Sequence, residues 1–197
     1  MKRDLLILVG PSAVGKTTVA DEILSGGGFS LIRSLTTRPP RGDGHDDEYI
    51  YTDREGFLRE VGRGGVLEHT EYVGTLYGTP RSEIERVLSE GKTPLLILDI
   101  NGAASLSERR GELCPCIIYL TEEEAVLRER LEARYLLGDA KDPEKYASRM
   151  ARNAWERENL PSLSHLFFRI VHGEKTPMLT AKAVLSAFRD FAENREK

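Results

Sequence analysis

The segment from Gly10 to Thr17 carries the clearest chemistry in the chain. It matches the pattern G-x-x-x-x-G-K-[ST], with Gly10, Gly15, Lys16 and Thr17 at the fixed positions. Glycines let the backbone curl so that successive N–H groups point at phosphate oxygens, and a following helix adds a favourable dipole. The lysine would reach the β- and γ-phosphates of a nucleoside triphosphate, and the threonine hydroxyl would bind Mg²⁺. We predict a triphosphate site formed by Ser12, Ala13, Val14, Gly15, Lys16, Thr17 and Thr18.

A second candidate, Asp99, follows the apolar segment 94–98. Ligands gather at the carboxyl ends of parallel strands, and a carboxylate there can hold Mg²⁺ through its water shell. An aspartate that begins a turn or a helix would occupy the same position. We therefore name Thr17 and Asp99 as metal candidates, and the pattern leaves a capping role for Asp99 open.

Buried strands and amphipathic helices are predicted to alternate around these residues. Continuous apolar runs of this kind are typical of strands buried on both faces, and strands separated by helices indicate a parallel sheet with helices on both sides. A Thr121-x-x-Glu124 capping box and the pairs Asp142-Pro143 and Thr176-Pro177 mark helix starts. The predicted strands are residues 5–9, 95–98, 116–120 and 166–171, and the predicted helices are 16–24, 122–136, 142–158 and a C-terminal helix from 177.

Residues 33–93 break this alternation. They contain short alternating strands, turn clusters and two short helices, one capped by Thr52-x-x-Glu55 and one from about Pro80 to Gly91. We expect an inserted subdomain within one domain that spans residues 1–197.

Composition limits the class of protein. A chain of 197 residues with a net charge of −4 is long enough for one well-packed domain and has no overall basic field that would attract nucleic acid. The longest charge-free stretch, residues 5–15, is far shorter than the roughly 20 residues of a membrane span, and it leads into a glycine-rich motif rather than a signal cleavage site. We expect a cytoplasmic protein without a membrane partner, with Cys114 and Cys116 as reduced thiols.

Five motifs in order resemble those of guanylate kinases. That family carries G-P-S-G-V-G-K-S, S-x-T-T-R-x-P-R, a D-Y-x-F turn, an I-E segment and Y-Y-G-S. The corresponding segments here are residues 10–17, 34–41, Glu48-Tyr49, Leu67-Glu68 and Tyr77-Gly78-Thr79. The resemblance covers residues 4 to about 152. It implies an α/β, three-layer fold of the P-loop nucleoside monophosphate kinase type, with a parallel sheet core, an inserted nucleotide-binding subdomain and a helical lid.

The resemblance also implies an acceptor site. Arginine forks and tyrosine hydroxyls suit a phosphate dianion, and one carboxylate can accept both N1–H and the exocyclic amine of guanine. The implied phosphate ligands are Arg38, Arg41, Tyr49 and Tyr77, and the implied base ligands are Glu68, Ser34, Thr79 and Asn101. Asn101 stands where the family has a second acid, so it brings an amide oxygen without charge.

Three basic residues are implied to act on the transferred phosphoryl group: Lys16, Arg134 and Arg149. The two arginines match the family's lid, although surface salt bridges would also explain arginines at helical spacing. The implied division is a core of residues 1–32, 94–127 and 153–197, a monophosphate-binding insert of 33–93, and a lid of about 128–152. We assign no role to His172.

The implied activity is the ATP-dependent, Mg²⁺-assisted phosphorylation of GMP, and also of dGMP, by a monomer or homodimer. Two alternatives stay open. One is a kinase of another phosphorylated small molecule on the same scaffold, which Asn101 would favour. The other is a non-catalytic guanylate-kinase-like binding module, against which the intact Lys16 and Thr17 argue.

Overall fold

The computed structural model describes the chain in two compact units. The first unit consists of Met1–Ile7 and Leu24–Pro115, and the second of Leu8–Ile23 and Cys116–Lys197. The residues that the structure describes are 3–40, 46–72, 74–108, 113–137 and 141–195. The predicted division into core, insert and lid stays a prediction.

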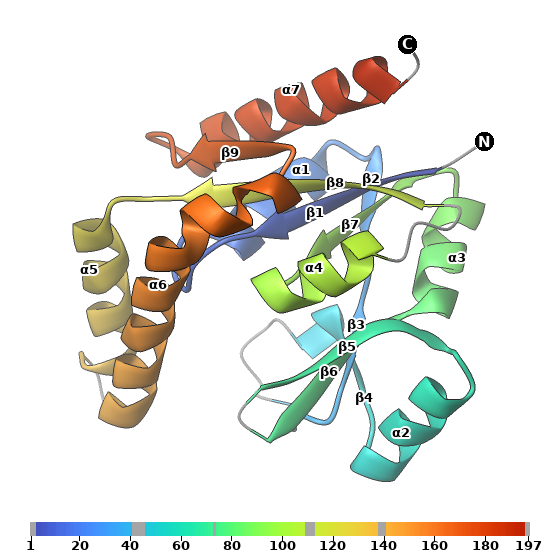
Figure 1. The fold of residues 1–197 in the computed structure, drawn as a ribbon, viewed down its shortest axis with the longest axis horizontal. Coiled ribbons are helices and arrows are strands. Elements are labelled where there is room, and N and C mark those ends of the chain that lie inside the picture. Colours follow the sequence, from blue (N-terminus) through green and yellow to red (C-terminus); the bar gives the residue numbers. More distant parts are fainter. Residues whose placement is uncertain (1–2, 41–45, 73, 109–112, 138–140, 196–197) are drawn as a thin grey trace. The chain divides into compact units, whose positions relative to one another are not determined.

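A five-stranded sheet has the strand order β2-β7-β1-β8-β9 (Figure 1). The strands are β1 (Arg3–Val9), β2 (Phe29–Leu31), β7 (Thr93–Ile97), β8 (Leu113–Thr121) and β9 (Arg169–His172). β2 pairs with β7, and β8 with β9, in parallel. All five side chains from Leu5 to Val9 are fully buried, as expected for a strand covered on both faces. The α/β prediction with a parallel sheet core is therefore confirmed.

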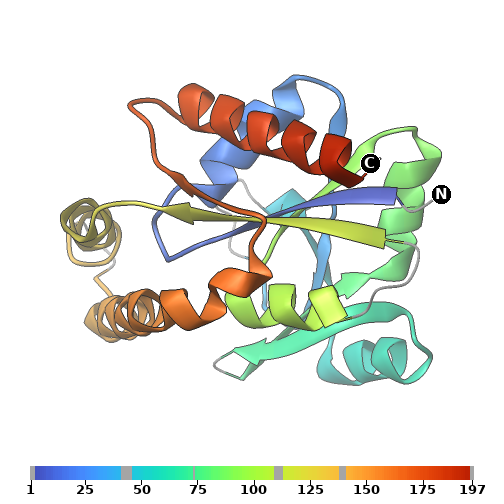
Figure 2. The same ribbon diagram turned by 45° about the horizontal axis from the view of Figure 1, so that its top comes forward.

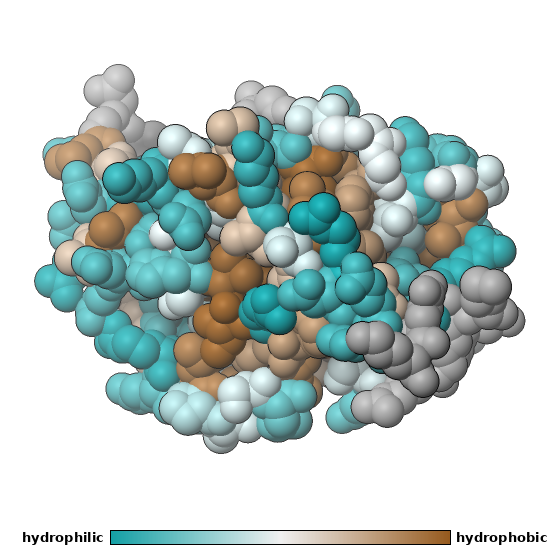
Figure 3. All heavy atoms as spheres, turned by 90° about the horizontal axis from the view of Figure 1, so that it is seen from above, coloured by the Kyte–Doolittle hydropathy of each residue, from teal (hydrophilic) through white to brown (hydrophobic). Residues whose placement is uncertain are grey.

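The α-helices among the described residues of the second unit are α1 (Lys16–Ser25, whose last two residues fall in the first unit), α5 (Glu124–Tyr135), α6 (Pro143–Leu163) and α7 (Pro177–Arg195). Within this unit, α6 and α7 lie on opposite sides of β8 (Figure 2). The buried residues of α7 are Thr180, Ala181, Val184 and Ala187, a stripe at helical spacing. Figure 3 looks onto the α7 side, where apolar atoms lie among hydrophilic ones.

The first unit also contains a four-stranded sheet with the order β4-β3-β6-β5. Its strands are β3 (Ser34–Thr36), β4 (Tyr49–Tyr51), β5 (Val66–Tyr72) and β6 (Thr75–Pro80), and its helices are α2 (Arg54–Gly62), α3 (Arg81–Ser89) and α4 (Ile100–Glu108). Phe57 of α2 packs with Leu35, Val66 and Leu76 into a small core against this sheet. α4, which the sequence pattern did not predict, packs against β5.

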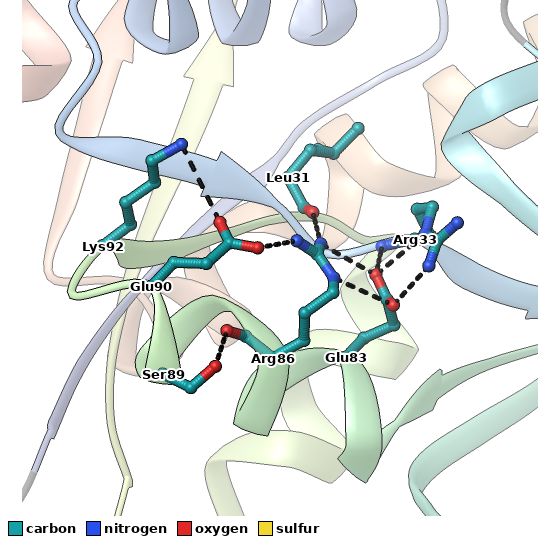
Figure 4. Close-up of polar contacts among 7 residues, drawn as sticks. All are labelled: Leu31, Arg33, Glu83, Arg86, Ser89, Glu90 and Lys92. Carbon is teal, nitrogen blue, oxygen red and sulfur yellow. Dashed lines mark hydrogen bonds and ion pairs between the residues drawn. The ribbon is translucent and has the colours of Figure 1, made fainter.

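A cluster of charged side chains around Glu83 lies next to the segment that leads from β2 into this sheet (Figure 4). Glu83 of α3 accepts hydrogen bonds from the Arg33 guanidinium at 2.7 and 3.0 Å and from Arg86 at 3.0 and 3.1 Å. Arg86 also donates to the carbonyl of Leu31, and Glu90 accepts from Arg86. Burial alone would raise the pKa of Glu83, but the bonds from both arginines outweigh it and lower the pKa to about 2. The cluster thereby ties α3 to the link between β2 and β3.

Two predicted helix caps are wrong. The cap of α2 is Asp53 rather than Thr52, because the Asp53 carboxylate accepts from the N–H of Gly56 at 2.6 Å. Thr121 ends β8 instead of capping α5, whose N-cap is Glu123 without a side-chain hydrogen bond. The prediction of Asp142 as a cap is confirmed, since its carboxylate accepts from the N–H of Lys145.

The boundaries of the last strand and of α6 also differ from the prediction. The last strand covers Arg169–His172 rather than 166–171, because a 3₁₀ turn at Ser164–Leu166 follows α6 directly. α6 continues to Leu163 instead of ending near Glu158, and it tolerates Pro161 close to its end. Pro161 removes one intrahelical hydrogen bond and its ring crowds the carbonyl of Arg157, but both effects fall in the last turn, so the rest of the helix is unaffected.

Candidate active site

The phosphate loop joins β1 to α1 in the second unit. Gly10 has a φ of +149°, and a Cβ there would lie 2.4 Å from the carbonyl oxygen of Leu120. Glycine is therefore required where the loop passes β8. Gly15 has a φ of +101° and Ala13 a φ of +68°. Ala13 is the single described residue other than glycine with a positive φ, and such a conformation is disfavoured for a residue with a Cβ.

The Lys16 ammonium lies over this loop. Its Nζ donates to the carbonyl oxygens of Gly10 at 2.7 Å and Pro11 at 3.1 Å. Thr17 follows within the first turn of α1 and is half-buried. The loop therefore gathers an ammonium, a hydroxyl and a helix N-terminus, the groups that bind phosphate and a hard cation.

Two side chains that the sequence pattern did not single out hold the loop from outside. Asn153 of α6 accepts from the Ser12 N–H at 2.8 Å and donates to the Ser12 carbonyl at 3.1 Å. Arg130 of α5 donates to the carbonyls of Ala13 at 3.1 Å and Val14 at 3.4 Å. No local motif marks either residue, because each contact depends on helices more than 100 residues away along the chain.

A cleft of about 590 Å³ opens beside the loop. It is lined by the loop, by Arg130 and Arg134 of α5, and by the turn from Gly173 to Lys175. Clefts of this size suit a molecule as large as a nucleoside. Arg134 lines this cleft, and Arg149 lies half-buried on α6. The roles of both arginines as phosphoryl ligands stay predictions.

In the first unit, a β-bulge presents Glu68. Val66 pairs with Pro80 and His69 with Gly78, so Leu67 and Glu68 together face Thr79. The Glu68 carboxylate is 2% exposed and accepts from the Thr79 hydroxyl at 2.5 Å. A Cβ on Gly102 of α4 would lie 3.2 Å from the other carboxylate oxygen of Glu68. The predicted pair of base ligands is therefore adjacent, and the carboxylate faces the start of α4.

Arg38 is buried among tyrosines on the same sheet. Its guanidinium lies 4.6 Å from the ring centroid of Tyr49, and its Nη2 donates to the Tyr51 hydroxyl at 3.4 Å. Tyr51 in turn donates to Asp46 at 2.7 Å, and burial and this bond raise the pKa of Tyr51. The Nε and Nη1 atoms of Arg38 are buried without a hydrogen-bond partner in the described part of the chain. Buried donors of this kind fit an anionic ligand.

The remaining predicted acceptor residues are distributed around this sheet. Tyr77 lies beside Tyr49, with ring centroids 6.4 Å apart, and Ser34 begins β3. Asn101 is exposed in the first turn of α4. Arg41 lies outside the described residues. Tyr51 was missed by sequence reasoning, although its alternation with Tyr49 on one strand could have indicated it.

Asp99 caps α4. Its carboxylate accepts from the Gly102 N–H at 2.7 Å through Oδ1, which confirms the structural alternative and occupies one of its oxygens. No group of three or more His, Cys, Asp or Glu side chains in the described ranges could hold a metal ion. The two candidates, Thr17 and Asp99, offer a hydroxyl and a carboxylate oxygen, the type of ligand that Mg²⁺ takes together with substrate phosphates. Asp99 and Thr17 belong to different units, so their joint role stays a prediction.

Comparison of the sequence with known proteins identifies its family. The family model described as guanylate kinase matches residues 2–158. A guanylate kinase of Thermus thermophilus is 38% identical over 173 residues, which cover 87% of this chain and 74% of that protein. A guanylate kinase of Anaplasma phagocytophilum is 35% identical over 155 residues, covering 77% and 72%. The crystal structure of guanylate kinase from Anaplasma phagocytophilum has a TM-score of 0.71 at 26% identity, covering 96% of this chain and 86% of that one. Among the described helices, none is both long and apolar enough to cross a membrane.

Proposed function

Because this chain belongs to the guanylate kinase family, we propose that it transfers the γ-phosphoryl group of ATP to the phosphate of GMP, giving GDP and ADP. The observation that carries the choice of acceptor is the buried Glu68 carboxylate, held by Thr79 at the bulge of β5. A carboxylate accepts the adjacent N1–H and amine donors of guanine. Adenine presents no such pair, so this group selects guanine.

The acceptor phosphate is bound by the Arg38 cluster. The unpartnered Nε and Nη1 of Arg38 supply two N–H donors for a dianion, Tyr49 lies beside the guanidinium, and Tyr77 lies beside Tyr49. Arg41 adds a second positive charge in the same segment, and Ser34 and Asn101 complete the base contacts. The acceptor is already an anion, so no strong general base is needed.

The donor triphosphate is bound by residues 12–18. Lys16 neutralises charge on the β- and γ-phosphates. Arg134, which lines the cleft, and Arg149 stabilise the negative charge of the phosphoryl group during its transfer. Thr17 and Asp99 are the residues that would hold Mg²⁺, which would neutralise charge on the phosphate oxygens. Positioning and electrostatics thus carry the catalysis. The protein acts on free nucleotides in the cytoplasm as a monomer or homodimer.

A coupled spectrophotometric assay over a panel of acceptors tests this proposal. The panel is GMP, dGMP, IMP, AMP, CMP, UMP and ribose phosphates, with ATP and Mg²⁺ as the donor mixture. We expect kcat/KM for GMP and dGMP to exceed that for AMP, CMP and UMP by at least about 10²-fold, because a buried carboxylate penalises bases that leave it unpaired.

Two results would contradict the proposal. A higher kcat/KM for a ribose phosphate or a pyrimidine nucleotide would support the alternative kinase on this scaffold, which the exposed Asn101 in place of the family's acid favours. Binding of GMP without turnover of any acceptor would support the binding module.

A further inference from the structure

Asn153 joins α6 to the phosphate loop. It is 8% exposed, and both ends of its amide bond the backbone of a single residue, Ser12, which is 141 positions away in the chain. The Oδ1 atom accepts from the Ser12 N–H, and the Nδ2 atom donates to the Ser12 carbonyl. The side chain therefore fixes the peptide planes on both sides of Ser12.

The backbone conformation of Ala13 explains why the restraint on Ser12 is important. Ala13 has a φ of +68°, a conformation that a Cβ disfavours. The peptide plane before Ala13 contains the Ser12 carbonyl, which Asn153 holds. The plane after Ala13 contains the Ala13 carbonyl, which Arg130 holds at 3.1 Å. The two dihedrals of Ala13 are thus constrained from both sides by side chains of α5 and α6.

These contacts also determine which backbone groups of the loop are bonded to side chains. The carbonyls of Ser12, Ala13 and Val14 are directed at Asn153 and Arg130, and the N–H of Ser12 is bonded to Asn153. With these carbonyls bonded to side chains, the N–H groups of the residues that follow are kept for phosphate oxygens, apart from that of Val14, which donates to the Pro11 carbonyl at 3.4 Å. A loop with a relaxed Ala13 would rotate these peptides and would have to be reordered whenever a nucleotide binds.

We propose that Asn153 is a positioning residue for the donor nucleotide, which keeps the Ser12–Ala13 peptide in the phosphate-binding conformation. Its side chain bonds the backbone of Ser12 and is not among the residues that line the cleft beside the loop. The proposal rests on the binding of ATP by this loop, which is part of the proposed function, but it does not depend on the identity of the acceptor.

The test compares Asn153→Ala with Asn159→Ala. Asn159 lies on the same helix and bonds only the carbonyl of Trp155 among its described side-chain contacts, so it is a matched control. Isothermal titration calorimetry measures the Kd for ATP, and steady-state kinetics measure KM for ATP and for GMP. We expect Asn153→Ala to raise the Kd and KM for ATP about tenfold, the effect of one or two lost hydrogen bonds, and to leave KM for GMP within about twofold. Asn159→Ala should leave all three within about twofold.

A double variant separates positioning from simple structural support. Glycine adopts a φ of +68° without strain, so Asn153→Ala combined with Ala13→Gly should recover a large part of the lost ATP affinity. A general loss of stability would weaken donor and acceptor alike and would not be recovered in this way. Circular dichroism melting of each variant identifies such a loss.

The outcomes are distinct. An ATP Kd for Asn153→Ala within twofold of wild type, equal losses for ATP and GMP, or no recovery in the double variant would overturn the proposal for Asn153. If wild-type protein binds ATP but does not phosphorylate GMP, the proposed acceptor is wrong, and the calorimetric comparison still decides the role of Asn153. If wild-type protein does not bind ATP, both proposals fail.

Discussion

At the scale of single residues, the groups that a side chain contacts in the folded protein decide which ligand it can bind. Glu68 is an ordinary acid in the sequence, but the Thr79 hydroxyl and the start of α4 fix its carboxylate in a buried position. Asp99 shows the opposite case, because one of its oxygens caps α4 and only part of its coordination capacity is left for a cation. Burial and hydrogen bonding, rather than residue type, therefore decide how much of each predicted ligand is available to bind a substrate or a cation.

Glu68→Gln gives the sharpest residue-scale prediction. The amide keeps one acceptor oxygen but turns the other position into a donor that faces a guanine donor. We expect kcat/KM for GMP to fall by roughly 10²–10⁴-fold, with a much smaller loss for IMP, which lacks the amine, and an unchanged KM for ATP.

The control for this measurement is Glu71→Gln on the same strand. Glu71 is about half exposed and pairs with Arg54 at 3.3 Å, so its substitution should leave all three constants unchanged. Equal losses for GMP and IMP in Glu68→Gln would show that Glu68 does not contact the guanine edge.

At the scale of elements, the bulge in β5 positions the Glu68 carboxylate, and the positive φ angles of the phosphate loop position its backbone groups. The bulge at Leu67-Glu68 requires β6 to approach β5 closely, and Gly78 makes this approach possible. A Cβ at Gly78 would lie 2.7 Å from Val66, 3.0 Å from the Glu68 carbonyl and 3.1 Å from Phe57. The glycine is required for space, and the carboxylate of Glu68 depends on it.

Gly78→Ala should therefore damage stability and GMP binding together. The added methyl overpacks the contact between β5, β6 and α2, which typically costs about 1–3 kcal/mol of unfolding free energy. Because the bulge shifts, KM for GMP should rise while KM for ATP stays near its wild-type value. Urea unfolding and steady-state kinetics check both effects.

Gly62→Ala is the matched substitution at an open position. It lies in the last turn of α2, and a Cβ there would meet no heavy atom within 4 Å. Since alanine is favoured over glycine in helices, this variant should be neutral or more stable by up to about 1 kcal/mol. A Gly78→Ala protein as stable as Gly62→Ala would contradict the packing argument.

At the scale of the whole molecule, the free energy of unfolding should depend on pH through Glu83. Its folded pKa of about 2 lies below the ordinary value of 4.5. The stabilisation is fully present above about pH 4.5 and is lost as the pH falls toward 2, because the unfolded chain then binds the proton more tightly. The buried position of Glu83 makes this on the order of 2–3 kcal/mol.

Glu83→Gln should remove this dependence. We expect a large difference in the unfolding midpoint between wild type and variant at about pH 7, shrinking steadily from about pH 4.5 to about pH 2.5. Glu55→Gln serves as the control, because Glu55 is 81% exposed and pairs with Arg59 on a solvated helix face. A constant difference between wild type and Glu83→Gln over this range would exclude the ion cluster as the cause.

The local sequence determined the elements whose signals are continuous. The apolar run of β1, the glycine pattern of the phosphate loop, and the caps at Asp142 and Thr176 each depend on neighbours within one or two turns of chain. The ordered motifs also identified the family. The predicted cap at Thr52 failed because the adjacent Asp53 accepts from the Gly56 N–H instead, and the one at Thr121 failed because Thr121 pairs with His172 at the end of β8.

Only the tertiary structure decided which side chains became constrained. Asn153 and Arg130 carry no motif, and their roles arise because α6 and α5 bring them to backbone groups more than 100 residues away in the chain. The sequence did not predict α4, because its start depends on Asp99 as the N-cap. An aspartate at the end of a strand can equally be a metal ligand or part of a turn, so its position alone did not mark a helix start. Hydrogen bonds between distant residues depend on the packing of whole elements, so no local pattern encodes them.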